Sequence, residues 1–370
     1  MEERQALLER KKSSLFTEVF LEPVLPYESN ISLKEIAQNA GVRERSAEIV
    51  GEALFGGFQE EGSEIKLRDH QAAALQHSFK PGTEDGRNVV ITSGTGSGKT
   101  ESFLLPVFTR LLEESARLIE ESPSSAVQAP LHEWWNESTS PNNWKNVRSN
   151  EQRSPGVRSL FLYPTNALVE DQMTRLRKAF RYINALPECH RFWFGRYTGG
   201  TLGSGDVPPG SKKRAIDKAA AEIKKEIEQI DVLQAAGLED EALYQYPDVR
   251  HGEMISRWDM IDAPPDILIT NYSMLNVMMM RDRDNPVFDQ TKQWLQESEE
   301  NVFTLVVDEL HMHRGTSGSE VAMIIRNLFN RLGLSADSPQ VRCIATSASL
   351  SADSTGDEFC QTFFGNVFQS

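Results

Sequence analysis

The sequence lacks paired cysteines and long apolar runs. Its 370 residues include three cysteines, Cys189, Cys343 and Cys360, and none belongs to a CxxC pair. This argues against a disulfide framework or a zinc site and predicts a reducing, cytoplasmic compartment. No apolar run approaches the length of a membrane span, and the first residues, MEERQALLERKK, contain no apolar signal region. We therefore expect no membrane partner.

An excess of positive charge is also absent. The chain has 39 basic and 54 acidic residues, a formal net charge of -15. Binding of nucleic acid through overall charge is thus disfavoured, and any such site must be a local basic channel. The length suits either one large α/β domain with additions or two domains.

Glycine is concentrated in one stretch, NVVITSGTGSGKTESFLLPVFT, from Asn88 to Thr109. An apolar run predicts a buried strand, a glycine-rich loop follows, and a helical pattern begins after it. Backbone N-H groups of such a loop surround phosphate oxygens, Lys99 neutralises the β and γ phosphates, and the Thr100 hydroxyl ligates Mg²⁺. The alternative, a glycine-rich turn without function, is disfavoured by the flanking strand and helix. The residues predicted to bind ATP are Ser93, Gly94, Thr95, Gly96, Ser97, Gly98, Lys99 and Thr100.

One position departs from the strict phosphate-loop pattern. Glycine is expected five residues before Gly98, and Ser93 stands there. Helicase-type phosphate loops often carry another small residue at this point, so the departure favours a helicase-type loop over other phosphate loops.

A second nucleotide-binding segment is predicted upstream, in LRDHQAAALQH. Gln71 offers a donor and an acceptor, which suits N6 and N7 of adenine, and Arg68 can stack on the ring. A surface glutamine at a helix start is the alternative, which its place just before the phosphate loop disfavours.

A carboxylate pair follows another apolar strand, in FTLVVDELHMHRG. We expect Asp308 to hold Mg²⁺, usually through water, and Glu309 to orient and polarise the water that attacks the γ phosphate. His311 and His313 lack further ligands at zinc spacing, so a metal interpretation is set aside. His311 is instead predicted to relay the nucleotide state to a facing domain.

Three further strand ends carry threonine with asparagine or glycine. Each is a weak turn signal alone, but in series behind a phosphate loop they predict a track for a sugar-phosphate backbone. The predicted nucleic-acid contacts are Pro164, Thr165 and Asn166 after one strand, Thr198 and Gly199 after the second, and Thr270 and Asn271 after the third.

Residues 1–60 read as a small helical module, and residues 61–370 as the main domain with insertions at about 113–158 and 203–263. The module resembles a helix-turn-helix around Gly41, although packing on the main domain is favoured. The tryptophans of the first insertion are predicted either to anchor the loop to the domain or to stack on bases, and anchoring is favoured. A charged amphipathic helix is predicted in the second insertion, and the segment Arg257, Trp258 and Asp259 is a candidate for strand separation.

The order of these motifs resembles the first RecA-like domain of a superfamily 2 DExH helicase. The segment DELHMHRGTSGSEVAMIIRNL is most similar to the MrfA and Hrq branch and to related bacterial phage-defence helicases. The resemblance covers about 65–370. It implies an α/β RecA-like P-loop fold with a mostly parallel sheet, and ATP-driven 3′ to 5′ movement on single-stranded DNA in repair or anti-phage defence. It also implies that Ser347, Ala348 and Ser349 link hydrolysis to the nucleic-acid track.

About twenty residues follow Ser349. We therefore expect the second RecA-like domain, with its arginine finger, to be supplied in cis or in trans, together with other subunits of a defence or repair complex. The cysteine-rich region of the MrfA branch is missing, which leaves the branch open. A nucleotide-binding scaffold and an RNA helicase remain alternatives to a DNA helicase.

Overall fold

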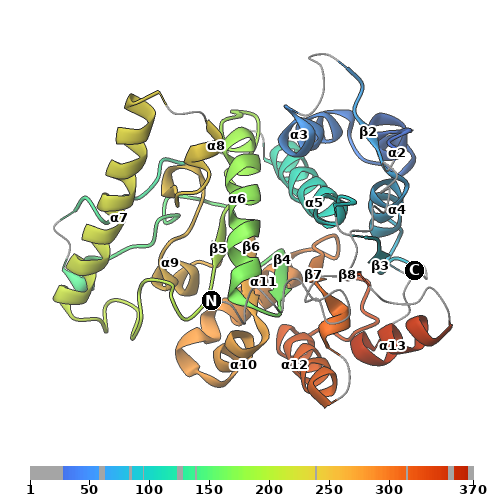
Figure 1. Ribbon diagram of the computed structural model, residues 1–370. Coiled ribbons are helices and arrows are strands. Elements are labelled where there is room, and N and C mark those ends of the chain that lie inside the picture. The colour runs from blue at the N-terminus through green and yellow to red at the C-terminus, as the bar shows by residue number, and fades with distance from the viewer. Residues whose placement is uncertain are drawn as a thin grey trace, which may run out of the picture.

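A six-stranded parallel sheet organises the protein (Figure 1). The computed structural model describes residues 28–57, 63–82, 86–94, 96–122, 128–137, 140–237, 240–313, 316–348 and 354–365. In spatial order the strands are β3 (Val89–Thr92), β8 (Val341–Ser347), β7 (Phe303–Val307), β4 (Ser159–Tyr163), β6 (Ile267–Asn271) and β5 (Phe194–Arg196). Because every pairing is parallel, all six carboxyl ends meet at one edge. The predicted α/β fold is confirmed.

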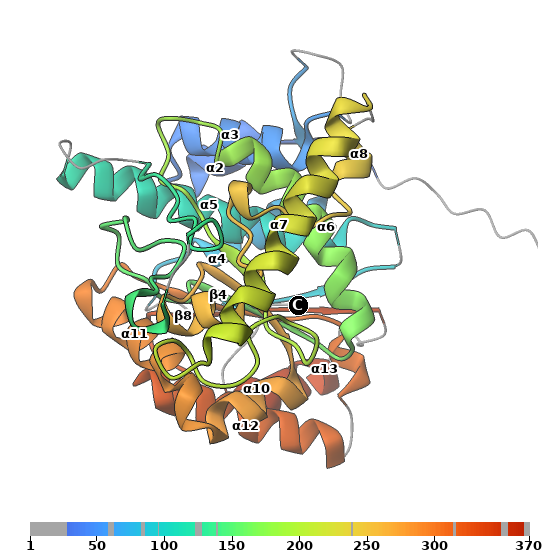
Figure 2. The same cartoon turned by 90° about the vertical axis from the view of Figure 1, so that its left-hand side faces the viewer.

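Helices cover both faces of this sheet, which Figure 2 shows between two helical layers. Side chains alternate between the faces, as strand geometry requires: Val90 belongs to one buried cluster, while Val89 and Ile91 belong to the other. One layer contains α3 (Glu44–Phe55), α4 (Asp69–Ser78), α5 (Lys99–Glu121) and α6 (Asn166–Ile183). The other contains α10 (Tyr272–Met280), α11 (Asn285–Glu297), α12 (Thr316–Leu332) and α13 (Ser354–Phe364). Within the described ranges, no helix has the length and apolarity needed to cross a membrane.

The N-terminal helices pack directly on the main domain. A short ladder pairs β1 (Ile31–Ser32) with β2 (Lys66–Leu67), and α2 (Leu33–Asn39) precedes α3. Gly41 separates these two helices with a φ of 73°, a conformation that favours glycine. Their apolar side chains share a buried cluster with α4 and α5. These contacts support the packing interpretation.

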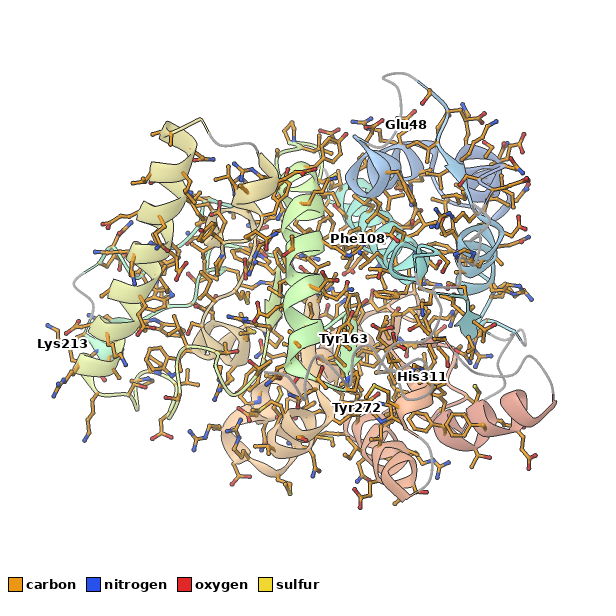
Figure 3. All side chains as sticks on the ribbon, viewed as in Figure 1. Glu48, Phe108, Tyr163, Lys213, Tyr272 and His311 are labelled. Atoms are coloured by element: carbon orange, nitrogen blue, oxygen red, sulfur yellow. The ribbon has the colours of Figure 1, made fainter. Side chains whose placement is uncertain are left out.

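The outward face of α3 is mostly acidic. Glu44, Glu48 and Glu52 are exposed there beside Arg45, and Glu48 points away from the sheet in Figure 3. Phosphates would be repelled by such a surface, so it gives no support to DNA reading by this helix.

The tryptophans of the first predicted insertion are buried. α5 continues through Glu121, so the helix includes the first residues of that insertion. Trp134, Trp135 and Trp144 are 0%, 2% and 9% exposed and form edge contacts with one another. They hold the loop against the domain, and stacking on bases is ruled out in this conformation.

The second insertion contributes α7 (Lys213–Ala235), α8 (Asp240–Leu243) and α9 (Arg257–Asp262). The charged helix predicted here is α7, which lies at the left of Figure 1 and buries Ile216, Ala219 and Ile223 against the body. The strand-separation hypothesis for the start of α9 is wrong, because Arg257, Trp258 and Asp259 are 7%, 1% and 3% exposed. Trp258 and Asp259 contact Trp134 and so hold the two insertions together, whereas Arg257 donates to the carbonyls of Thr198 and Gly199.

Candidate active site

The glycine-rich loop connects β3 to α5 at the carboxyl edge. Gly96 and Gly98 have φ values of 77° and 80°, and Gly98 caps the helix that begins at Lys99. Ser93 Oγ lies 2.6 Å from Ser97 Oγ, so the serine at the expected glycine position closes the loop onto itself. The result is a preformed turn leading into a helix N-terminus, where backbone N-H groups are available to an anion.

The start of α4 holds three consecutive carbonyls of this loop. Arg68 donates to Gly96 O at 3.2 Å, His70 Nε2 lies 2.9 Å from Ser97 O, and Gln71 donates to Gly98 O at 3.3 Å. In a planar trans peptide the C=O and the following N-H point in opposite directions. The N-H groups after these carbonyls therefore point away from α4, as a phosphate cradle requires. Nothing in the sequence pattern signalled the contribution of His70.

Gln71 has a second structural role. Its side chain is 4% exposed, and its oxygen accepts from the Arg68 backbone N-H at 3.0 Å in a capping box. A Cβ at Gly98 would lie 2.6 Å from Gln71 Nε2, which explains the glycine there. One amide hydrogen and one oxygen lone pair remain for adenine, so adenine reading by Gln71 and Arg68 stays a prediction.

Lys99 and Thr100 form the first turn of α5 and are half-buried. The turn is braced by Ser102, whose hydroxyl donates to Gly98 O at 3.1 Å. Gly94 is exposed at the start of the loop. Thr95 lies outside the described residues.

The carboxylate pair directly follows β7, two strands from the phosphate loop. Glu309 has a φ of 54°, a left-handed conformation that costs a non-glycine residue about 1 to 3 kcal/mol. Thr346 on the adjacent β8 donates its hydroxyl to Asp308 and accepts the Glu309 backbone N-H at 3.3 Å. Thr346 thus holds both acidic residues in place, a role that its sequence position did not indicate.

Burial raises the pKa of Asp308 above its ordinary value, and the neighbouring Glu309 raises it further. The Thr346 hydroxyl and the charge of Lys99 oppose this rise. Lys99 therefore acts electrostatically on Asp308 across the edge. Additional positive charge at this point would favour the ionised carboxylate.

Several buried polar atoms beside this pair have no hydrogen-bond partner among the described residues. They are His313 Nε2, Tyr163 Oη and Tyr272 Oη. Figure 3 labels Tyr163, Tyr272 and His311 around this part of the edge. Buried polar groups ordinarily find partners, so the cluster has capacity for water, a ligand or a facing surface.

The two histidines are placed differently. His311 Nδ1 lies 3.1 Å from Glu309 Oε2, close enough for an ion pair if the imidazole is protonated. His313 stacks edge-on against Tyr272 with 4.3 Å between ring centroids, and burial lowers its pKa to about 4. Among the described residues, no group of three or more His, Cys, Asp or Glu side chains is arranged to hold a metal.

The end of β8 lies between the phosphate loop and the carboxylate pair, because β8 separates β3 from β7. Ser347 is 0% exposed and Ala348 is exposed. Ser349 lies outside the described residues.

The other half of the edge is formed by β4, β6 and β5. Thr165 and Asn166 are exposed at the start of α6, and Pro164 is half-buried. Asn271 donates to Asn166 Oδ1 at 2.6 Å, which joins the ends of β4 and β6. These two strand ends present a continuous polar surface.

Thr198 and Gly199 form a turn after β5. Thr198 is 6% exposed, and its backbone N-H donates to Thr201 Oγ1 at 3.0 Å. Gly199 is exposed, and Arg257 donates to its carbonyl at 2.8 Å. The threonine hydroxyl is therefore internal, whereas the glycine backbone is accessible to a ligand.

Thr270 lies beneath the surface. It is 0% exposed, and its hydroxyl donates to Tyr197 O at 2.6 Å. Thr270 thus joins β6 to β5 and does not reach a nucleic acid in this conformation. We expected Thr270 to contact nucleic acid directly, but its hydroxyl instead supports the ends of the two strands.

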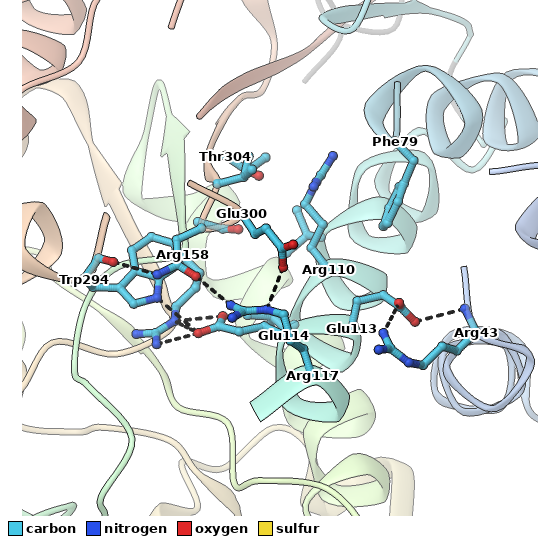
Figure 4. Close-up of a pocket in the computed structure, with 15 residues that line it drawn as sticks. Arg43, Phe79, Arg110, Glu113, Glu114, Arg117, Arg158, Trp294, Glu300 and Thr304 are labelled. Atoms are coloured by element: carbon cyan, nitrogen blue, oxygen red, sulfur yellow. Dashed lines mark hydrogen bonds and ion pairs between the residues drawn. The ribbon is translucent and has the colours of Figure 1, made fainter. Parts of the chain in front are cut away.

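A cavity of about 300 Å³ lies at the opposite, amino edge of the sheet (Figure 4). Three of its arginines face carboxylates: Arg43 with Glu113 at 2.6 Å, Arg158 with Glu114 at 2.8 Å, and Arg117 with Glu300 at 3.1 Å. Arg110 stacks over Phe79. This cavity belongs to the junction between the N-terminal helices and the sheet, away from the carboxyl edge.

The parallel sheet, its glycine-rich loop and the facing carboxylate pair define the class of the chain as a P-loop NTPase. Residues 68–198 match the family model of the DEAD/DEAH box helicases. The chain is 32% identical to Druantia protein DruE of Escherichia coli (strain UMEA 4076-1) over an alignment of 416 positions, and 24% identical to an uncharacterized ATP-dependent helicase of Methanocaldococcus jannaschii over one of 305. It is also similar to the crystal structure of the DUF1998 helicase MrfA bound to DNA, with 20% identity and a TM-score of 0.45 over 87% of this chain and 29% of that one.

These matches confirm the resemblance to superfamily 2 DEAD/DEAH-type helicases that the motifs predicted. The alignments cover 98% of this chain and 20% of the Druantia protein, and 82% of this chain and 28% of the archaeal helicase. The chain therefore spans less than a third of the length of these relatives.

Proposed function

We propose that this chain is the N-terminal motor half of an ATP-dependent helicase or translocase that moves on single-stranded DNA. One observation carries the proposal: a single sheet edge unites a phosphate loop, a carboxylate pair and an exposed polar track. Neighbouring strands thereby bring nucleotide chemistry and backbone binding together, which suits a motor better than a metabolite enzyme.

The loop fits the phosphates of ATP. A Cβ at Gly96 would meet nothing within 4 Å, so the backbone is open to a close approach. Lys99 and the N-H groups of the loop are the residues that would hold the phosphates, and Gln71 with Arg68 would select adenine.

The carboxylate pair fits Mg²⁺ and a water. Thr100 and Asp308 would hold the metal, which supplies positive charge to the phosphates when bound. Glu309 would accept a proton from the attacking water through Oε2, for which His311 is the one candidate partner in the described part of the chain. His311, 3.1 Å from this oxygen, would communicate the state of Glu309 to a facing surface.

The track would bind DNA mainly through its backbone. Asn166, Thr165, Asn271 and the Gly199 peptide are the groups that would contact phosphate and sugar, with Pro164 shaping the turn. Thr198 and Thr270 would support this surface from below. Ser347, Ala348 and Ser349 would link the nucleotide half of the edge to it.

Efficient turnover would require a second RecA-like domain. Phosphoryl transfer needs positive charge on both sides of the γ phosphate, and an arginine finger contributes about 10³ to 10⁵ in rate. Near this pair, His313 Nε2, Tyr163 Oη and Tyr272 Oη have no hydrogen-bond partner among the described residues, which supports a facing surface at this point. The second domain would act in cis or in trans.

Steady-state ATP hydrolysis tests the proposal. Residues 1–370 alone should bind ATP-Mg²⁺ weakly, hydrolyse it barely and unwind nothing. Addition of the second RecA-like half should restore DNA-stimulated turnover by about 10³ or more. Strong DNA-stimulated turnover by residues 1–370 alone would contradict the two-domain requirement.

A nucleotide-binding scaffold in a defence or repair complex is the second candidate, and the Druantia relative favours a defence setting. Such a scaffold would bind ATP without DNA-stimulated turnover in the complete assembly. RNA is the third possibility, because backbone contacts carry little information about the sugar. Stimulation by RNA but not by DNA of equal length would assign it.

A further inference from the structure

α6 makes polar contacts with three separate parts of the carboxyl edge. Its first residue, Asn166, contacts Asn271 at the end of β6. One turn later, Glu170 pairs with Arg196 at the end of β5. Further along, Arg175 pairs with Glu101 in the first turn of α5. The helix therefore connects the predicted DNA track to the phosphate loop.

Glu101 stands two residues after Lys99. Its Oε1 accepts a hydrogen bond from Arg175, and its Oε2 lies 3.3 Å from the position of a Cβ on Gly98. The carboxylate therefore lies against the phosphate loop on one side and against α6 on the other. Residues 101 and 175 are 74 positions apart, so the tertiary fold creates this contact.

A carboxylate beside a phosphate site needs an explanation, because like charges repel. An acidic side chain in the first turn of a helix is favourable by itself, but a bound triphosphate would repel it. Arg175 neutralises Glu101 and offers it a position on the side of α6. Occupancy of the loop should therefore strengthen the contact between Glu101 and Arg175.

Stability alone does not account for the pair. The two side chains are 22% and 43% exposed, and exposed ion pairs contribute only about 0 to 1 kcal/mol. Its distinguishing feature is its location between the two halves of the edge.

We propose that Glu101 and Arg175 are positioning residues that transmit the occupancy of the phosphate loop, through α6, to Thr165 and Asn166. The inference rests on the proposed function and adds a route by which nucleotide regulates the grip on DNA. The pair touches neither the reacting phosphate nor the DNA.

The test measures ATP turnover with and without single-stranded DNA in the chain joined to its second RecA-like half. Glu101→Gln and Arg175→Met should each reduce the stimulation by DNA about 5-fold or more, with little change in the KM for ATP. The charge exchange Glu101→Arg with Arg175→Glu should recover a substantial part of the loss, because it restores the attraction.

Asp171→Asn is the matched control. Asp171 is 70% exposed and lies 3.8 Å from Arg175, one turn away on the same helix. This variant should retain the stimulation of the unmodified protein. Unchanged stimulation in both single variants, or no recovery in the exchange, would overturn the inference. If Arg175→Met fails to fold, Arg175→Lys replaces it. This variant keeps the charge and should therefore retain the stimulation that Glu101→Gln loses.

Hydrogen exchange separates this inference from the proposed function. On addition of ATP-Mg²⁺ to residues 1–370, amides at the start of α6 should gain protection in the unmodified chain and not in Glu101→Gln. ATP-dependent protection that is identical in the two proteins overturns the coupling role, whether or not DNA stimulates turnover. Absent DNA stimulation in the unmodified assembly counts against the motor proposal instead.

Discussion

The two halves of the carboxyl edge are constructed differently. In the nucleotide half, formed by β3, β8 and β7, contacts lie within the edge itself: Ser93 contacts Ser97, and Thr346 joins Asp308 to the Glu309 backbone. In the nucleic-acid half, formed by β4, β6 and β5, the contacting groups are held from outside. Arg257 of the second insertion fixes the turn at Gly199, and Asp259 ties that insertion to the first through Trp134.

This difference follows from what each half has to bind. A triphosphate and a metal need charged groups fixed at short range before binding, because reorganisation would reduce catalysis. A sugar-phosphate backbone needs a long surface of weak contacts. We therefore expect single substitutions to have large effects in the nucleotide half and small ones in the nucleic-acid half.

The largest effect should come from Glu309→Gln in the assembled protein. The amide cannot accept the proton of the attacking water, so turnover should fall by about 10² to 10⁴ while ATP binding is retained. Lys99→Ala is the contrasting variant, and it should weaken ATP-Mg²⁺ binding itself. Binding by titration calorimetry and turnover by phosphate release measure both. An unchanged hydrolysis rate in Glu309→Gln would remove the role assigned to Glu309.

Because of Asp259, the folding stability of the insertions that hold the nucleic-acid half should depend on pH. Burial raises its pKa to about 7 from 3.8, so between about pH 4 and 7 the folded chain binds a proton that the unfolded chain lacks. Stability should therefore fall as pH rises through this window and stay low above it, by up to about 4 kcal/mol.

The variant Asp259→Asn removes this titration while its amide oxygen still accepts from Trp134 and Val147. Its melting temperature should exceed that of the unmodified chain at pH 8 and approach it at pH 5. The added hydrogen-exchange protection should lie in the insertions. Equal gains in hydrogen-exchange protection at the phosphate loop would contradict the difference between the two halves.

Gln71→Ala tests two roles of one residue. Removal of the adenine contacts should reduce the preference for ATP over GTP by about 1 to 3 kcal/mol. Loss of the bond to the Gly98 carbonyl should also weaken both nucleotides. Fluorescence titration with labelled ATP and GTP resolves the two effects. Equal affinities for ATP and GTP in the unmodified protein would contradict the role of Gln71 in selecting adenine.

The smallest effect should come from Asn166→Ala in the nucleic-acid half. One polar group and its bond to Asn271 are lost, so affinity for single-stranded DNA should fall by about 1 kcal/mol, roughly 5-fold. The salt dependence should stay the same, because no charge is removed. Fluorescence anisotropy at two salt concentrations measures both, with exposed Asn276→Ala on α10 as the control. A loss above a hundredfold would mean that this half also depends on a few fixed contacts.

Local pattern was sufficient for the nucleotide half. A buried strand, a glycine-rich loop and a helix start are features of consecutive residues, and β3, Gly96, Gly98 and the start of α5 follow that prediction. The carboxylate pair was likewise predicted by its position after an apolar strand. The mostly parallel sheet was an implication of the resemblance to RecA-like helicase domains.

Only the tertiary structure decided which strand-end side chains reach the surface. Thr165, Thr198 and Thr270 occupy equivalent positions in the sequence pattern, yet one is exposed and two are buried. Strand periodicity gives the face of a side chain but not what covers it: Thr270 bonds to Tyr197 after the neighbouring strand, and Thr198 bonds to Thr201 within its own turn.

The partners of the functional residues were also decided by the fold. Thr346 contacts Asp308 across 38 positions, Gln71 contacts Gly98 across 27, and Arg175 contacts Glu101 across 74. Contacts between residues so distant in the chain leave no periodic signal in one sequence, because they depend on how helices settle on the sheet. The sequence by itself determined the phosphate loop, the carboxylate pair and the strand ends, since each is a property of neighbouring residues, while packing decided what holds them and which of them meet a ligand.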